Sequence, residues 1–262
     1  MKYFLKILNP IKAPLIITCA ISTTVAYSNE YYGSFGIDNT ILTDKTYDWN
    51  EDHYPYKFST DVMSFRAEAG KHINDKFDLG FELMTTSNFS HKYNGPIEPN
   101  YDGIPGINFT ALSQEPKVYA SQQIKSTTLL LQGKYKYRPY FFSNDANIYG
   151  RTGVGLAFNR SSYYIRNIMQ SLEVIYPANT KTNLGLSIGG GFEKQVGKAK
   201  FGIGYDCYSV GSFQTKKQAY IKDFSTGIES VQVAKDDEII GKQLRPANTL
   251  LHSINISVSF DF

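Results

Sequence analysis

Apolar and polar residues alternate over the last fifteen residues of the chain, Asn248 to Phe262. From Leu250 onward the even positions carry mostly apolar or aromatic side chains, and the odd positions after Leu251 carry hydroxyl, amide or carboxyl groups. Successive side chains of a β-strand point to opposite faces, so one face of such a strand is apolar and the other is polar. The run is about twice the usual strand length of 5–6 residues. The pattern therefore predicts one long amphipathic strand.

The same alternation recurs in seven earlier stretches. They cover residues 31–38, 63–70, 77–84, 128–138, 148–159, 184–193 and 201–208. With the C-terminal run they make eight predicted strands. No run of about 18 apolar residues, the length that a membrane-spanning helix needs, follows residue 28. The chain beyond residue 28 is therefore predicted to be all-β.

The connections between these strands are alternately short and long. The short turns are residues 72–76, 142–145 and 197–198, and the long loops are approximately residues 39–60, 89–122, 160–181 and 213–247. Short turns on one side, long loops on the other and an even strand number are typical of outer-membrane barrels. We therefore predict an eight-stranded antiparallel up-and-down transmembrane β-barrel, with four long extracellular loops and both termini in the periplasm. A soluble, lipocalin-like barrel with an apolar interior is the alternative.

The first 28 residues have the features of an export signal. A leader with Lys2, Lys6 and Lys12 precedes an apolar run from residue 13 to 25, and cleavage is expected after Ser28 or after Ala26. A membrane anchor is the alternative, but the apolar run is shorter than about 18 residues. A lipoprotein signal at residue 19 is a second alternative, although the apolar run continues past that cysteine. We predict a signal peptide over residues 1–28 and one barrel domain over residues 29–262.

Composition narrows the function classes. The mean hydropathy of −0.31 is too polar for a helical membrane protein, and aromatic residues make up 15% of the chain. Removing residues 1–26 takes away three of the 27 basic residues and none of the 24 acidic ones, which leaves 24 of each. The exported chain is thus formally neutral, and no nucleic-acid partner is expected. Its one remaining cysteine, Cys207, excludes an internal disulfide and a cysteine-based zinc site.

The chain resembles the eight-stranded outer-membrane barrels that include the OmpA transmembrane domain, the OmpX/Ail proteins and the neisserial opacity proteins. The resemblance rests on the signal peptide, the rhythm of strands and loops, the stretch YGRTGVGLAF from Tyr149 to Phe158, and the terminal VSFDF. It implies that the barrel assembly machinery reads Phe262 as an assembly signal. It also implies that the loops mediate adhesion or host-factor binding, or that the barrel is structural.

Charged residues occupy inward positions of the predicted strands. They are Arg66, Glu68, Asp78, Glu82, Lys134, Lys136, Arg151, Glu193 and Asp206. Side chains fill the interior of an eight-stranded barrel, and buried charges are costly unless they are paired. We therefore expect a lumenal charge network that plugs the barrel, with a core of Arg66, Glu68, Glu82, Lys134, Arg151 and Glu193. A gated ion path is the alternative.

Catalytic and metal-binding patterns are weak in this sequence. His252 and Ser253 are adjacent, but neighbours on a strand face opposite sides and cannot share a proton. The other histidines, at positions 53, 72 and 91, lie in predicted loops or a turn without metal-ligand spacing. We predict no catalytic residues, no metal, no cofactor and no enzymatic activity.

Candidate binding residues lie in the predicted loops. In the first loop the aromatic residues Trp49, Tyr54 and Tyr56 stand beside four acids. In the third loop Ile165, Ile168, Met169 and Leu172 recur at helical spacing, which predicts a short amphipathic helix. Such a helix could cap the barrel mouth, lie on the outer leaflet or dock a partner.

These patterns favour a surface-exposed, adhesin- or opacity-like protein of the outer membrane that acts through its loops. A narrow channel, a transporter of small hydrophobic molecules and a structural protein are the alternatives. The expected partners are outer-membrane lipid and lipopolysaccharide, the barrel assembly machinery, and host or matrix proteins.

Overall fold

The structure, a computed structural model, describes residues 30–43, 56–58, 61–95, 118–140, 145–167, 172–216, 218–223, 228–233 and 249–262. The predicted signal peptide of residues 1–28 lies outside the described residues. In the part of the chain that is described, no helix is long and apolar enough to cross a bilayer.

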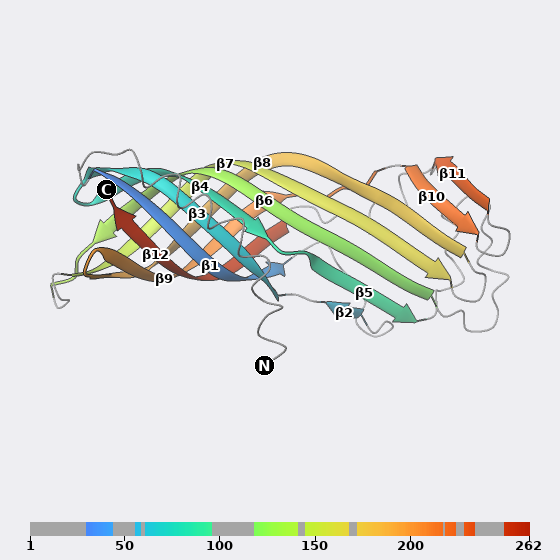
Figure 1. The fold of residues 1–262 in the computed structure, drawn as a ribbon, viewed down its shortest axis with the longest axis horizontal. Helices are drawn as coiled ribbons and strands as arrows, with labels where there is room; N and C mark the ends of the chain where they lie inside the picture. Colours follow the sequence, from blue (N-terminus) through green and yellow to red (C-terminus); the bar gives the residue numbers. More distant parts are fainter. Residues whose placement is uncertain are drawn as a thin grey trace.

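The described residues form strands that wind into a barrel (Figure 1). The strands are β1 (Tyr31–Thr43), β2 (Tyr56–Phe58), β3 (Asp61–Asn74), β4 (Phe77–Thr86), β5 (Phe89–Gly95), β6 (Val118–Tyr137), β7 (Ala146–Asn167), β8 (Leu172–Val196), β9 (Ala199–Gly211), β10 (Gln218–Asp223), β11 (Ile228–Val233) and β12 (Thr249–Asp261). Every described pairing is antiparallel. Each of the eight predicted strands corresponds to one of these elements.

The wall of the barrel closes between the first and last strands. The pairing runs from β1 through β3, β4, β6, β7, β8 and β9 to β12, and β12 returns to β1 with Tyr32 opposite Asp261. Strand β5 continues β4 along β6, with Phe89 opposite Ile124. Among the described residues the wall therefore has eight strands in up-and-down order, which confirms the predicted eight-stranded antiparallel barrel.

The short turns, among them residues 75–76 and 197–198, lie at one end of the barrel, called here the turn end. Gly197 lies in the turn between β8 and β9 with φ of +64°, a conformation that residues with a Cβ rarely adopt. The start of β1 and the residue that follows β12 meet at this end, because the Phe262 N–H donates to the Tyr31 carbonyl oxygen at 2.9 Å.

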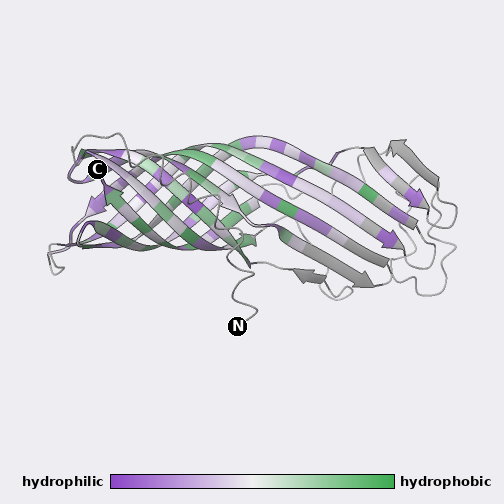
Figure 2. Ribbon diagram, in the orientation of Figure 1, coloured by the Kyte–Doolittle hydropathy of each residue, from purple (hydrophilic) through white to green (hydrophobic). Residues whose placement is uncertain are grey.

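The outside of the barrel is apolar and its inside is polar at mid-height, because apolar side chains are exposed there and charged ones are buried. Hydrophobic and hydrophilic residues are intermixed along the strands of the barrel (Figure 2). Large apolar side chains are exposed all around the wall, among them Ile37, Met63, Phe81, Leu131, Leu156, Ile188, Ile203 and Ile256. Ile256 is 66% exposed, whereas Glu82, at an inward position, is 0% exposed. The lipocalin-like alternative is therefore wrong, since its polarity would be the reverse. The distribution is that of a barrel surrounded by lipid, and we call the apolar exterior the belt.

One side of the wall is much taller than the other. Strand β9 reaches only Leu186 of β8, so residues 172–185 of β8 run on for about 45 Å along the strand, at about 3.3 Å per residue. Strands β5, β6 and β7 accompany this part of β8, and β10 pairs with its beginning. We call this projecting sheet the loop-side extension. It comprises β5, β10, β11 and residues 118–126, 159–167 and 172–181 (Figure 1).

The extension corrects the prediction of a long third loop with a helix. Residues 160–167 and 172–181 continue β7 and β8, with Ile165 opposite Val174 and Asn167 opposite Leu172. Residues 161–167 (SSYYIRN) and 172–176 (LEVIY) are rich in aromatic and β-branched residues, which favour strands. The apolar spacing of this segment also suits a helix, but the segment forms strands because β7 and β8 pair with each other across the hairpin. Parts of the predicted second and fourth loops are likewise strands, namely β5, β10 and β11.

Candidate functional site

Two arginine side chains occupy the centre of the lumen. Arg66 projects from β3 and Arg151 from β7, and their side chains are 3% and 7% exposed. Arg66 lies 2.5 Å from Asp38, 2.9 Å from Asp206 and 3.6 Å from Glu82, measured from guanidinium nitrogen to carboxylate oxygen. Asp38 and Glu82 come from β1 and β4, the two strands that pair with β3, whereas Asp206 reaches Arg66 across the lumen from β9.

Arg151 binds Asp206 with two nitrogens. Its Nε donates to Oδ1 at 2.6 Å and its Nη2 donates to Oδ2. Its Nη1 also lies 3.4 Å from Glu82 and 3.6 Å from Glu68. Bidentate arginine–carboxylate pairs are among the stronger hydrogen-bonded ion pairs. Asp206 consequently joins both arginines and connects β3, β7 and β9 across the lumen.

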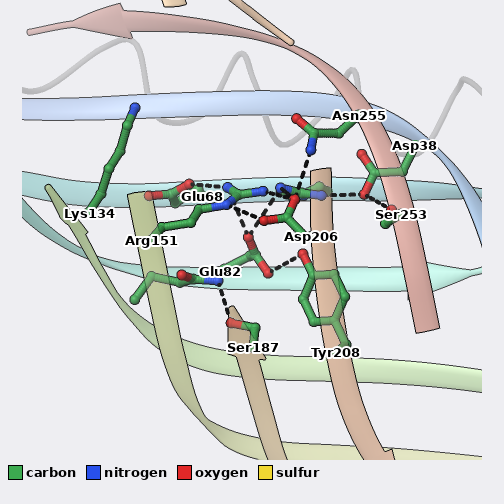
Figure 3. Close-up of polar contacts among 12 residues, drawn as sticks. Asp38, Glu68, Glu82, Lys134, Arg151, Ser187, Asp206, Tyr208, Ser253 and Asn255 are labelled. Atoms are coloured by element: carbon green, nitrogen blue, oxygen red, sulfur yellow. Dashed lines mark hydrogen bonds and ion pairs between the residues drawn. The ribbon is translucent and has the colours of Figure 1, made fainter. Parts of the chain in front are cut away.

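We call the six ionisable residues Asp38, Arg66, Glu68, Glu82, Arg151 and Asp206 the central cluster (Figure 3). It holds four carboxyl groups and two guanidinium groups. Neutral donors supply the remaining hydrogen bonds to the carboxyl oxygens. They are Tyr32 to Glu68 at 2.5 Å, Tyr208 to Glu82 at 3.0 Å, Ser253 to Asp38 at 3.0 Å and Asn255 to Asp206 at 2.7 Å.

A second group of charges lies closer to the turn end. The Lys134 ammonium donates to Glu193 and lies 4.4 Å from the centroid of the Tyr149 ring. Further along, a turn-end cluster is formed by His72, Asp78, Lys136, Lys200 and Asp261. In it, Lys136 lies 2.8 Å from Asp78 and Lys200 lies 2.6 Å from Asp261. Ionic contacts therefore continue from the middle of the lumen to its turn end.

The loop side of the lumen is filled by large apolar side chains with short polar ones, such as Ser126, Thr128 and Asn159, buried between them. Ten buried residues pack together there, namely Leu42, Met84, Phe89, Ile124, Leu130, Ala157, Tyr208, Val210, Phe213 and Leu251. Phe213, just after β9, is 0% exposed. We call this group the apolar layer. Tyr208 belongs to it and also donates to Glu82, so the apolar layer rests directly on the central cluster.

A polar cavity remains on the other side of the central cluster. Its volume is about 20 Å³, which is space for about one water molecule. Tyr32, Ser34, Lys134, Tyr149 and Lys200 are among its lining residues. Arg66 and Arg151 also line it, so the cavity ends against the central cluster. Even at this level the lumen is therefore narrow, with space for little more than a water molecule.

The structure brings the six predicted network residues together inside the barrel. Arg66, Glu68, Glu82 and Arg151 are in the central cluster, and Lys134 pairs with Glu193 beside it. Sequence reasoning missed Asp38, although it has the inward phase of the first predicted strand. It also missed the hydroxyl and amide donors, and the odd positions of β12 carried the signal for Ser253 and Asn255.

The predicted loop-binding residues do not form one site. Trp49, Tyr54, Ile168 and Met169 lie outside the described residues. Tyr56 is in β2 opposite Tyr93. Ile165 and Leu172, as described above, are strand residues at the end of the loop-side extension. The predicted assembly signal, Phe262, follows β12 at the turn end and its backbone pairs with Tyr31.

His252 and Ser253 point to opposite sides of β12, as expected from strand geometry. Ser253 is in the lumen, where its hydroxyl lies 3.1 Å from that of Thr40 and donates to Asp38. His252 is outside, with Nδ1 2.5 Å from the Tyr205 hydroxyl. Among the described residues no group of three or more histidine, cysteine, aspartate or glutamate side chains is placed to hold a metal ion.

Comparisons with known proteins relate the chain by fold. No protein-family model matches the sequence, and no curated protein matches it. The outer membrane protease OmpT from Escherichia coli is 7% identical and has a TM-score of 0.50, over 92% of this chain and 99% of that chain. Ail, the attachment invasion locus protein of Yersinia pestis, is 9% identical with a TM-score of 0.39, over 90% and 100%. Neisserial surface protein A is 14% identical with a TM-score of 0.39, over 90% and 98%.

At these identities the likeness concerns the fold alone. The fold is that of outer-membrane β-barrels, and it agrees with the apolar belt and the polar interior described above. The chain is therefore a transmembrane barrel of the outer-membrane type.

Proposed function

We propose that this outer-membrane barrel displays a binding surface outside the cell, in the manner of an adhesin or opacity protein, and that it is neither a channel nor an enzyme. The observation that carries the proposal is the contrast between a filled lumen and a wall in which β8 runs on for about 45 Å, along the strand, beyond its last pairing with β9. A channel needs a continuous aqueous path. A binding protein needs a surface that stands clear of the membrane.

The two filled layers of the lumen support this choice against a channel. In the central cluster the side chains of Asp38 and Glu82 are 0% exposed. In the apolar layer Phe213, Leu251 and Tyr208 are 0% exposed as well. An ion crossing the barrel would have to separate buried ion pairs and also enter a packed apolar region, and both steps are costly.

The loop-side extension supports the binding role. Its outward positions change from leucine on the belt to polar residues further along, including Gln123, Lys125, Arg160 and Thr180. A polar sheet face is suited to contact with water and with a protein partner. In the described strand order β11 is an edge strand, and an edge strand can pair with a strand of another protein. We propose host or matrix proteins as the partners of this surface.

The proposed arrangement in the cell follows from the two ends of the barrel. The loop-side extension faces the outside, and the turns and both chain ends face the periplasm, where Phe262 serves as the signal for the barrel assembly machinery. Outer-membrane lipid and lipopolysaccharide surround the belt.

The test compares the intact barrel with a trimmed barrel. In the trimmed barrel an Asn-Gly turn replaces residues 162–178, because Ser161 and Asn179 are direct partners that a two-residue turn can connect. A second Asn-Gly turn replaces residues 91–122 between the partners Ser90 and Gln123. The matched control places an Asn-Gly turn at residues 75–76, between the partners Asn74 and Phe77 at the turn end, and leaves the loop-side extension unchanged.

Binding to host cells and to immobilised matrix proteins is measured for all three refolded proteins. The intact barrel and the control should bind, and the trimmed barrel should lose at least about tenfold in affinity, which corresponds to about 1.4 kcal/mol. Equal binding by the trimmed barrel, or no binding by the intact barrel, would remove the proposal.

The apolar layer favours a second candidate, the admission of small hydrophobic molecules from the loop side. In that case Phe213 and Leu251 would act as a displaceable stopper rather than as a permanent core. Uptake of a small hydrophobic fluorophore by vesicles containing the barrel should then rise in a Phe213→Ala variant. Unchanged uptake in this variant counts against the second candidate.

A further inference from the structure

Two basic side chains stand next to each other on the outer surface of the barrel. Lys125 of β6 and Arg160 of β7 are direct partners in the antiparallel register. Both occupy outward positions and both are exposed. We call them the basic couple. Side chains at directly opposite positions lie about 4.5–5.5 Å apart at Cβ, and like charges there repel each other.

The basic couple lies just beyond the edge of the belt. The last row of leucines across β6, β7 and β8 consists of Leu129, Leu156 and Leu184. The next outward row is Thr127, Phe158 and Thr182, and the row after it is Lys125, Arg160 and Thr180. The couple is thus four residues beyond the leucines, about 13 Å along the strand and roughly 10 Å along the membrane normal for a strand tilt near 40°. Lipid head groups are found at this height.

The part of the protein that the structure describes offers this couple no counter-charge. Within the described residues neither Lys125 nor Arg160 forms an ion pair. In the described part of the neighbouring wall, the outward carboxylates on the loop side are Asp61, two strands away on β3, and Glu173, opposite Arg166 and six residues further along β7. By contrast, Lys71, an outward base near the turn end, lies 3.1 Å from Glu30.

We propose that the basic couple binds a phosphate group of a phosphorylated lipid in the surrounding leaflet. Arginine presents paired N–H donors that fit phosphate oxygens, and lysine adds a mobile point charge. The hydroxyl of Thr180, exposed beside Arg160 in the same row, is a further donor. A phosphate held here would relieve the repulsion within the couple and anchor the taller side of the wall to the membrane surface. The site is independent of any partner at the tip of the loop-side extension.

The test measures lipid retention by the refolded full barrel in detergent micelles, using diphosphoryl lipid A as the probe and native mass spectrometry as the readout. The double variant Lys125→Gln/Arg160→Gln removes the couple. The control Lys181→Gln removes one charge at nearly the same height but from the inner face, where Lys181 donates to the Ser212 hydroxyl at 2.7 Å. The swap Lys125→Arg/Arg160→Lys keeps both charges and shows whether the position tolerates substitution.

Each basic residue near an anionic lipid surface contributes about fivefold in affinity, so the double variant should bind the probe roughly 25-fold more weakly. The control and the swap should bind within about twofold of the unmodified barrel, and dephosphorylated lipid A should bind the unmodified barrel as weakly as the double variant binds the probe. Retention by the double variant equal to that of the unmodified barrel would overturn the proposal. Equal binding of phosphorylated and dephosphorylated lipid A by the unmodified barrel would overturn it as well.

Discussion

Replacing Arg66 with methionine should strongly destabilise the barrel. Arg66 lies within 4 Å of three carboxylates, those of Asp38, Glu82 and Asp206, and its side chain is 3% exposed. Its removal leaves four carboxyl groups of the central cluster facing Arg151 alone. Breaking a buried pair by removing one partner costs about 3–5 kcal/mol, because the remaining charge stays buried without compensation. We expect a loss in this range for Arg66→Met.

A second substitution should return part of that loss. Asp38 has the shortest contact with Arg66, and asparagine in its place would keep the hydrogen bond from Ser253 while removing one charge. The double variant Arg66→Met/Asp38→Asn should therefore be more stable than Arg66→Met by at least about 1 kcal/mol. The control is Lys71→Met on the same strand, whose ion pair with Glu30 is 45% and 57% exposed. Exposed pairs contribute about 0–1 kcal/mol.

The assay is reversible urea unfolding of the refolded barrel in lipid vesicles, followed by far-ultraviolet circular dichroism. The free energy of unfolding is extrapolated to zero urea for the unmodified barrel and the three variants. If Arg66→Met stayed within about 1 kcal/mol of the unmodified barrel, the view that the ion pairs of Arg66 stabilise the buried central cluster would be refuted. A loss for Lys71→Met as large as that for Arg66→Met would refute it as well.

Two further predictions concern the belt and a turn. Ile256→Arg places a charge on the lipid-facing side of β12, where Ile256 is 66% exposed, and should cost about 2–4 kcal/mol in the same unfolding assay. Val196→Arg at the turn end, where Val196 is 57% exposed, should stay within about 0.5 kcal/mol, and equal costs for both variants would contradict the placement of the belt. Gly197→Ala should cost about 1–2 kcal/mol because φ is +64°. Gly150→Ala, where an added Cβ meets no atom within 4 Å, should change stability by a few tenths of a kcal/mol, and the reverse order of the two effects would contradict the turn geometry.

The strands of the belt could be predicted from the sequence, because positions that face lipid need apolar side chains and the alternate positions, which face the lumen, carry polar ones. Strand β12 shows this most clearly, with Ile254 and Ile256 outside and Ser253 and Asn255 inside. The same phase placed Arg66, Glu68 and Arg151 in one lumen before any contact was known. What each arginine binds could not be predicted, since Asp38, Asp206 and Glu82 come from three other strands and meet only in the closed barrel.

The loop-side extension could not be predicted in this way. Above the belt both faces of the sheet can be polar, so alternation between apolar and polar residues fades. Around Ile165 the apolar spacing also suited a helix, and the deciding fact was the pairing of β7 with β8 across the hairpin. The β-propensity of Tyr163, Tyr164 and Ile175 indicated strands, but the prediction gave more weight to the helical spacing of the apolar residues.

The apolar layer was missed for a related reason. The predicted filling of the lumen was a charge network, and it did not include the inward side chains of Leu42, Leu130 and Leu251. Their inward phase is visible in the sequence: Leu251, for example, shares its face with Ser253 and Asn255. The two layers together, one ionic and one apolar, are the basis for proposing that the lumen does not conduct.

Ion conductance across a planar lipid bilayer containing the refolded barrel tests the central claim of a filled lumen most directly. Recordings are made on the unmodified barrel and on Glu82→Ala, Arg151→Ala and Phe213→Ala variants at the same protein density. Because each single variant leaves one of the two layers intact, all four proteins are predicted to be silent. Discrete conductance steps from the unmodified barrel, altered by Glu82→Ala or Arg151→Ala, would contradict a sealed lumen and establish a gated ion path.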